Sequence, residues 1–142
     1  MKVYRTDEIR NVVLLGHGGS GKTSLAEAMA YVSGATNRMG KITDGNTISD
    51  FDKEEQKREF SISTSLIPIE WEKAKINILD TPGYFDFVGE VEEAVSAADA
   101  ASRPDADRKE RREIFFILIP HFSRTAYHKS VLHTLILANN IP

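Results

Sequence analysis

The sequence predicts an α/β fold in which helices flank a mostly parallel sheet. A continuous apolar run over 11–15 leads through a glycine-rich loop into strong helix formers over 22–32. A second apolar run, over 76–79, leads through another loop into a segment with the apolar spacing of a helix over 86–98. Strands that alternate with helices in this way are typical of parallel sheets.

Each expected element has a local signal. The first helix carries apolar residues at the spacing of one helix face, and Gly34 is a stop signal. Residues 35–60 show no useful apolar periodicity, and a loop of this length is usually functional or mobile. A strand over 61–71, rich in β-branched and hydroxyl residues, and the strand over 76–79 flank a short turn, which predicts a hairpin.

The chain changes character near Ser102. Residues 1–101 carry 11 basic and 17 acidic side chains, whereas residues 102–142 carry 7 and 4. In the second part we expect a polar segment, a strand over 114–119 and a helix over 124–138. Two interpretations of this part stay open: an insertion before a continuing fold, or a divergent or truncated continuation without an inherited function.

Composition narrows the class of protein. The 142 residues suit one domain, and the absence of cysteine excludes a disulfide framework and a thiolate metal site. The longest apolar run, 114–120, is too short to span a bilayer. A net charge of −3 argues against a broad nucleic-acid surface. We therefore expect a soluble cytoplasmic monomer that binds neither a membrane nor DNA.

The loop after the first strand fits the complete pattern of a phosphate-binding loop, G-x-x-x-x-G-K-[ST]. Its glycines let backbone N–H groups turn toward one anion, and the following helix presents its positive end to the same anion. We expect Lys22 to contact the β- and γ-phosphates and stabilise the developing charge, and Thr23 to bind Mg²⁺. His17 is expected to contribute its backbone rather than its ring. The predicted binding residues of this loop are Gly16, His17, Gly18, Gly19, Ser20, Gly21, Lys22, Thr23 and Ser24.

A second acidic motif ends the strand over 76–79 and consists of Asp80, Thr81, Pro82 and Gly83. An acid at a strand end near a phosphate loop can hold Mg²⁺ directly or through water, and Gly83 can offer its N–H to the γ-phosphate. Alone, this motif usually marks a turn. Its position after a phosphate loop and one hairpin makes it a candidate part of the same site.

The motifs at 16–24, 80–87 and 91–99, in this order, resemble the GTPase domain of bacterial elongation factor G. They look closest to the elongation-factor-G-like branch of translational GTPases, over about residues 5–101. The resemblance implies the N-terminal part of a G domain with the phosphate-loop NTPase fold, incomplete at its C-terminus. It also implies binding of GTP and GDP with Mg²⁺, GTP hydrolysis stimulated by the ribosome, and a role in translation elongation or ribosome recycling.

The resemblance also assigns switch segments. Residues 35–60 become the first switch and residues 80–87 the second switch, whose order depends on the nucleotide. The family's Arg-Gly-Ile-Thr falls on residues 58–61, where Ser61 keeps a hydroxyl for Mg²⁺ beside Thr23 and Asp80. Glu59 and Phe60 replace smaller or more flexible residues there, which puts closure of the first switch in doubt.

Two further departures concern catalysis and selectivity. The histidine that orients the attacking water in the family is Tyr84 here, and a phenol with a pKa near 10 is a poor base at neutral pH. We expect slower or more partner-dependent hydrolysis; alternatively, Tyr84 packs against Phe85 or Phe87 and takes no part in chemistry. The guanine-reading Asn-Lys-x-Asp motif is absent. The competing hypothesis is therefore a non-catalytic nucleotide-binding remnant without guanine selectivity.

Overall fold

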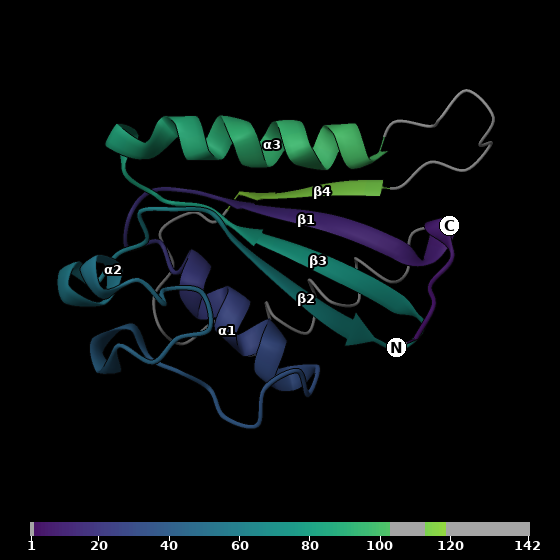
Figure 1. Cartoon of the computed structure of the whole chain (residues 1–142), viewed down its shortest axis with the longest axis horizontal. Helices are drawn as coiled ribbons and strands as arrows, with labels where there is room; N and C mark the ends of the chain where they lie inside the picture. The colour runs from purple at the N-terminus through teal and green to yellow at the C-terminus, as the bar shows by residue number, and fades with distance from the viewer. Residues whose placement is uncertain (1, 103–112, 119–142) are drawn as a thin grey trace.

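A four-stranded sheet with the order β2-β3-β1-β4 organises the computed structural model, which describes residues 2–102 and 113–118 (Figure 1). β1 pairs in parallel with β3 and β4, whereas β2 pairs antiparallel with β3. The strands are β1 (Ile9–Leu15), β2 (Ser65–Trp71), β3 (Ala74–Asp80) and β4 (Glu113–Leu118). The predicted mostly parallel sheet and its hairpin are confirmed.

Helices cover both faces of this sheet: α1 (Lys22–Val32) lies on one face and α3 (Val88–Ser102) on the other (Figure 1). Successive residues of a strand point to opposite faces. Val12 and Leu14 of β1 therefore join the apolar cluster of α1, while Val13 packs with Ala94 and Ala98 of α3. Burial on both faces explains the continuous apolar run in β1. No helix in the described ranges is long and apolar enough to cross a membrane.

The segment over 35–60 contains more structure than the sequence predicts. It holds a short 3-10 helix, η2 (Ile42–Asp44), and the six-residue helix α2 (Lys53–Arg58). Asp52 caps α2 by accepting a hydrogen bond from Glu54 N, and the Glu54 carboxylate pairs with Arg58 3.2 Å away. Capping and an ion pair stabilise this exposed helix, so apolar periodicity gives no sign of it.

Three predicted elements have different bounds in the structure. The strand predicted over 61–71 begins only at Ser65, because the amides of residues 62–64 donate to the glutamates Glu55 and Glu90. In place of the helix predicted over 86–98, the structure has a 3-10 turn, η3 (Phe85–Phe87), followed by α3, which ends four residues later than predicted. β3 is longer than predicted at both ends. A further 3-10 turn, η1 (Thr6–Glu8), precedes β1.

β4 occupies the place of the strand predicted over 114–119 and adds to the sheet beside β1. Both interpretations of the second part of the chain, an insertion before a continuing fold and a divergent or truncated continuation without an inherited function, stay open. The helix predicted over 124–138 lies outside the described residues. The division of the chain at residues 101 and 102 stays a prediction.

Candidate functional site

The loop between β1 and α1 has the backbone that an anion site requires. Gly19 and Gly21 have φ angles of 76° and 99°, in the left-handed region that glycine adopts without strain. Gly21 is the N-cap of α1, so no side chain caps the first turn of this helix. The free N–H groups of that turn, with the helix dipole behind them, form a ready anion-binding end.

Lys22 folds back over this loop. Its Nζ donates hydrogen bonds to the carbonyl oxygens of Gly16, at 2.7 Å, and His17, at 3.0 Å. Burial lowers the pKa of Lys22, and the negative charge of Asp80 opposes this shift. The ammonium group is therefore held at the loop, where it can meet an incoming phosphate with little rearrangement.

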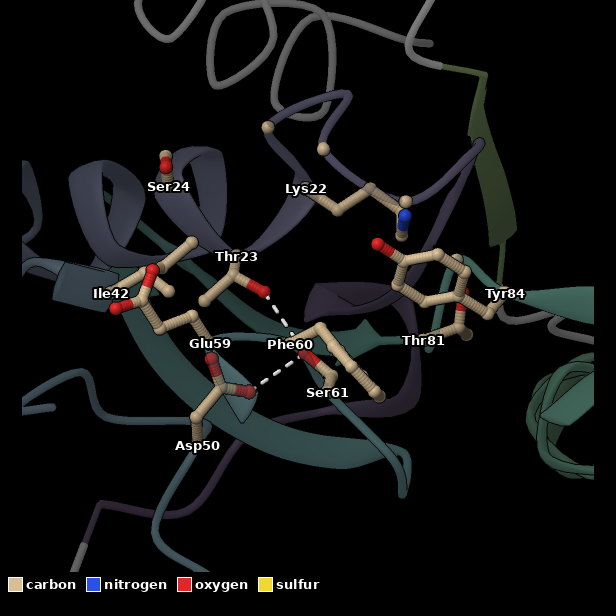
Figure 2. Close-up of a pocket in the computed structure, with 14 residues that line it drawn as sticks. Lys22, Thr23, Ser24, Ile42, Asp50, Glu59, Phe60, Ser61, Thr81 and Tyr84 are labelled. Atoms are coloured by element: carbon tan, nitrogen blue, oxygen red, sulfur yellow. Dashed lines mark hydrogen bonds between the residues drawn. The ribbon is translucent and has the colours of Figure 1, made fainter. Parts of the chain in front are cut away.

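A cavity of about 240 Å³ lies between the phosphate loop, the first switch and the second switch (Figure 2). Most of the predicted site residues line it, from three separate segments of the chain. Its lining residues are Gly18, Gly19, Gly21, Lys22, Thr23, Ser24, Ile42, Asp50, Glu59, Phe60, Ser61, Thr81, Gly83 and Tyr84.

Five predicted residues do not line the cavity: Gly16, His17, Ser20, Asp80 and Pro82. The positions of Gly16, His17, Ser20 and Pro82 indicate support of the loops, whereas the carboxylate of Asp80 lies behind the cavity with both of its oxygens unpartnered among the described residues. Ser20, Asp80 and Pro82 are buried beneath the surface. The His17 ring bonds the Gly18 carbonyl through Nδ1 at 2.6 Å, and a role for His17 through its backbone stays a prediction.

Thr81 lines the cavity, but its hydroxyl is already used. Thr81 Oγ1 donates to the Leu14 carbonyl at 2.6 Å, and the residue is 1% exposed. This bond ties the end of β3 to the end of β1, from which the phosphate loop departs. We therefore place Thr81 in the support of the site rather than among its direct ligands.

Three oxygen-bearing side chains meet in a chain of hydrogen bonds beside the loop (Figure 2). Ser61 Oγ donates to Asp50 Oδ1 at 2.7 Å and lies 3.2 Å from Thr23 Oγ1. Since the Ser61 proton is directed to Asp50, Thr23 is the donor in the second contact. The sequence predicts Thr23 and Ser61 as hydroxyl ligands of one ion, and the fold brings these two hydroxyls together across 38 residues.

Asp80 lies at the end of β3, behind these hydroxyls, and is 1% exposed. Burial raises the pKa of Asp80 to about 6; the nearby hydroxyls of Thr23 and Ser49 oppose the shift without reaching hydrogen-bond geometry, and the negative charge of Asp50 adds to it. Among the described residues, both Asp80 oxygens and Asp50 Oδ2 are buried without a hydrogen-bond partner. Oxygen donors with uncompensated negative charge are what Mg²⁺ prefers, so the residues present fit this ion.

Sequence reasoning missed Asp50. This residue is 4% exposed, and burial raises the pKa of its carboxyl above the ordinary value. Its acidic run also contains Asp52 and Glu54, and no single-sequence signal separates the buried acid from its exposed neighbours. Asp50 belongs to the site because Ser61, which contacts Thr23, also bonds the Asp50 carboxylate.

The phosphate loop and the second switch are in direct contact. Gly18 N donates to the Gly83 carbonyl at 2.8 Å. A methyl group added to Gly83 would lie 2.5 Å from Lys22 Nζ and 2.6 Å from the His17 carbonyl carbon, and closer still to Gly18 N. Only glycine permits this approach at residue 83.

Tyr84 covers the same place from the other side. A methyl group on Gly18 would lie 2.8 Å from two ring carbons of Tyr84, so the ring rests on the loop. The ring centroids of Tyr84 and Phe60 are 4.7 Å apart. The packing partners considered above, Phe85 and Phe87, are replaced by Phe60 and His17, because η3 begins after Tyr84 and leaves Phe85 87% exposed.

About two thirds of the chain matches known proteins. The family model described as the elongation factor Tu GTP binding domain matches residues 7–102. The elongation factor G-like protein of Mycobacterium tuberculosis is 42% identical over 93 residues, which cover 66% of this chain and 13% of that protein. The mitochondrial ribosome-releasing factor 2 of Anopheles gambiae is 42% identical over 91 residues, which cover 64% and 12%.

A solved structure from Thermus thermophilus gives a TM-score of 0.59 at 27% identity, over 92% of this chain and 22% of that one. The chain spans about one eighth of the length of the curated relatives named above. The match to the family model covers more than half of the chain, and the relatives are elongation-factor-G-like translation proteins. The chain therefore belongs to the family of the elongation factor Tu GTP-binding domain.

Proposed function

We propose that this chain binds GTP with Mg²⁺ and hydrolyses it to GDP, as the nucleotide-binding part of a cytoplasmic translational GTPase that the ribosome stimulates. One observation carries the proposal. Lys22 and Thr23 of the phosphate loop, Ser61 after the first switch, and Gly83 and Tyr84 of the second switch line a single cavity. These are the parts that transfer of a γ-phosphoryl group to water requires.

The roles follow from the contacts. The backbone amides of the phosphate loop and Lys22 would hold the β- and γ-phosphates, with Lys22 exchanging its carbonyl partners for phosphate oxygens. Thr23, Ser61 and Asp80 would hold Mg²⁺, Asp80 directly or through water. When bound, the ion neutralises charge that develops on the phosphate oxygens. Gly83 would present its N–H to the γ-phosphate.

Tyr84 takes the place of the family's water-orienting histidine and lines the cavity. Its phenol can donate a hydrogen bond but is a poor general base at neutral pH. Its ring is also held by Phe60 and rests on Gly18. We therefore propose slow intrinsic hydrolysis that depends on a partner to reorient Tyr84 or to supply a group of its own.

Equilibrium binding of GTP, GDP and ATP, with and without Mg²⁺, tests the proposal. We expect Mg²⁺-dependent GTP binding with rejection of ATP. Lys22→Ala should weaken GTP binding by about 100-fold, since it removes a partly buried cation from the phosphate. Lys73→Ala is the matched control, because Lys73 is exposed in the turn after β2.

The outcomes separate the two hypotheses. Equal, weak binding of GTP and ATP would contradict a selective GTPase and favour the remnant without guanine selectivity. GTP affinity that is unchanged by Lys22→Ala would refute the assignment of the phosphate loop itself.

A further inference from the structure

Glu90 makes two contacts with Thr64, across 26 residues of sequence. The Glu90 carboxylate accepts a hydrogen bond from Thr64 N at 2.7 Å, and the Glu90 backbone carbonyl accepts one from Thr64 Oγ1 at 3.1 Å. Both residues are half-buried. Two bonds between one pair of residues fix the distance and the orientation of the two backbones.

The positions of these residues give the contact its importance. Thr64 comes three residues after Ser61, the predicted hydroxyl ligand, and directly before β2. Glu90 lies in the first turn of α3, directly after η3 and the second switch. The pair therefore joins the segment that carries Ser61 to the helix that follows Tyr84.

The segment over 35–64 depends on such polar contacts. Its buried residues are polar or glycine, with no buried apolar side chain among them: Gly40, Thr47, Ser49, Asp50 and Glu55. Burial of apolar surface, the usual source of packing stability, therefore contributes little to its position.

Three carboxylates instead hold the backbone of this segment by accepting hydrogen bonds from its N–H groups. Glu27 of α1 accepts hydrogen bonds from Gly40 N and Ile48 N at 2.8 and 2.9 Å. Glu55 of α2 accepts from Ile62 N and Ser63 N, on the same oxygen, at 2.9 and 3.1 Å. Glu90 is the one of these three that lies beyond the second switch.

We propose that Glu90 is a positioning residue that holds Thr64, and through it Ser61, against the helix that follows the second switch. A movement of α3 would then displace Ser61, and release of Ser61 would loosen the start of α3. An effect of Glu90 on the binding of Mg²⁺ and GTP rests on the proposed function. The contact between Glu90 and Thr64 does not.

Limited trypsin digestion of the whole chain tests this proposal, because the rate of cleavage within α2 reports how often this segment opens. The exposed helix α2 offers Lys53, Lys57 and Arg58 as cleavage sites. Loss of a hydrogen bond to a charged group corresponds to roughly a tenfold change in a local opening equilibrium. We therefore expect Glu90→Ala to be cleaved in α2 about tenfold faster, without nucleotide.

Two variants separate positioning from a general loss of charge or fold. Glu90→Gln keeps an acceptor oxygen at the same place and should stay within about threefold of the unmodified chain. Glu93→Ala removes the same charge from an exposed site on α3 and should leave the rate unchanged. Amide exchange at Val12 and Val13 of β1 reports whether the core stays intact.

Cleavage of Glu90→Ala at the rate of Glu93→Ala would overturn the proposal, as would equal acceleration by Glu90→Gln and Glu90→Ala. With GTP present, Glu90→Ala should also need about tenfold more Mg²⁺ for protection of α2. If the unmodified chain gains no protection from GTP and Mg²⁺, the proposed function fails, while the comparison without nucleotide still decides the role of Glu90.

Discussion

Gly83→Ala should separate the second switch from the phosphate loop. The added methyl group would lie 2.5 Å from Lys22 Nζ and 2.6 Å from the His17 carbonyl carbon. The end of the Lys22 side chain could shift, but the contacts with backbone atoms of His17 and Gly18 are relieved only if the loops move apart and lose the bond from Gly18 N to the Gly83 carbonyl. Overpacking against backbone and a lost hydrogen bond together disfavour the present arrangement by about 3 kcal/mol.

A difference of this size is about 100-fold in the population of the arrangement in which both loops contact one phosphate. We therefore expect Gly83→Ala to weaken GTP binding by about 100-fold in a fluorescence titration. The midpoint of thermal unfolding should change little, because the loops can separate without opening the core. Fully retained GTP affinity in this variant would refute the reasoning.

Alanine substitutions at two other glycines, Gly18 and Gly89, test whether the effect at Gly83 is steric. A methyl group on Gly18 would meet the ring of Tyr84, which can shift as a side chain, so Gly18→Ala should weaken GTP binding by less than Gly83→Ala. Gly89→Ala is the matched control: no atom lies within 4 Å of the added methyl group, and Gly89 is in α3. This variant should bind GTP normally. Equal losses in all three variants would show that the effect is not steric.

Two further predictions concern Asp80 and Tyr84. Because burial raises the pKa of Asp80 from 3.8 to about 6, the folded chain binds that proton more tightly than the unfolded chain, and the stability from this group falls as pH rises from about 4 to about 6. In urea unfolding without Mg²⁺, Asp80→Asn should therefore be more stable than the unmodified chain at pH 7.5, by up to about 3 kcal/mol, and lose this advantage near pH 4. Tyr84→His should speed GTP hydrolysis measured by phosphate release, with Tyr84→Phe as the control; equal rates in the two variants would contradict a role for the ring nitrogen.

The elements that the sequence predicts well have signals within a few residues. β1 reads as a buried strand because both of its faces are covered, and the bounds of α1 match the prediction from helix formers and a glycine stop. The contact of the two loops also follows from local rules, since parallel strands β1 and β3 bring their carboxyl ends to one edge of the sheet. Phosphate loop and second switch leave from that edge.

The first switch shows where such rules stop. Its backbone is held by Glu27 of α1, the following Thr64 is held by Glu90 of α3, and its acid at residue 50 bonds Ser61 eleven residues away. Nothing in the local sequence of Glu90 distinguishes it from Glu92 or Glu93, which are exposed. A contact set by tertiary geometry alone leaves no periodic or motif signal in one sequence.

The two departures from the family pattern that the sequence presents separately, Phe60 and Tyr84, form one contact in the fold. Aromatic rings at this spacing attract each other by about 1 kcal/mol beyond the area that they bury. This attraction draws the end of the first switch toward the second, which compensates for the loss of the smaller residue expected at position 60. It also holds the Tyr84 ring above Gly18. Under the proposed function, the Tyr84 ring would have to leave this contact before it could orient a water, so the same contact would make hydrolysis depend on a partner.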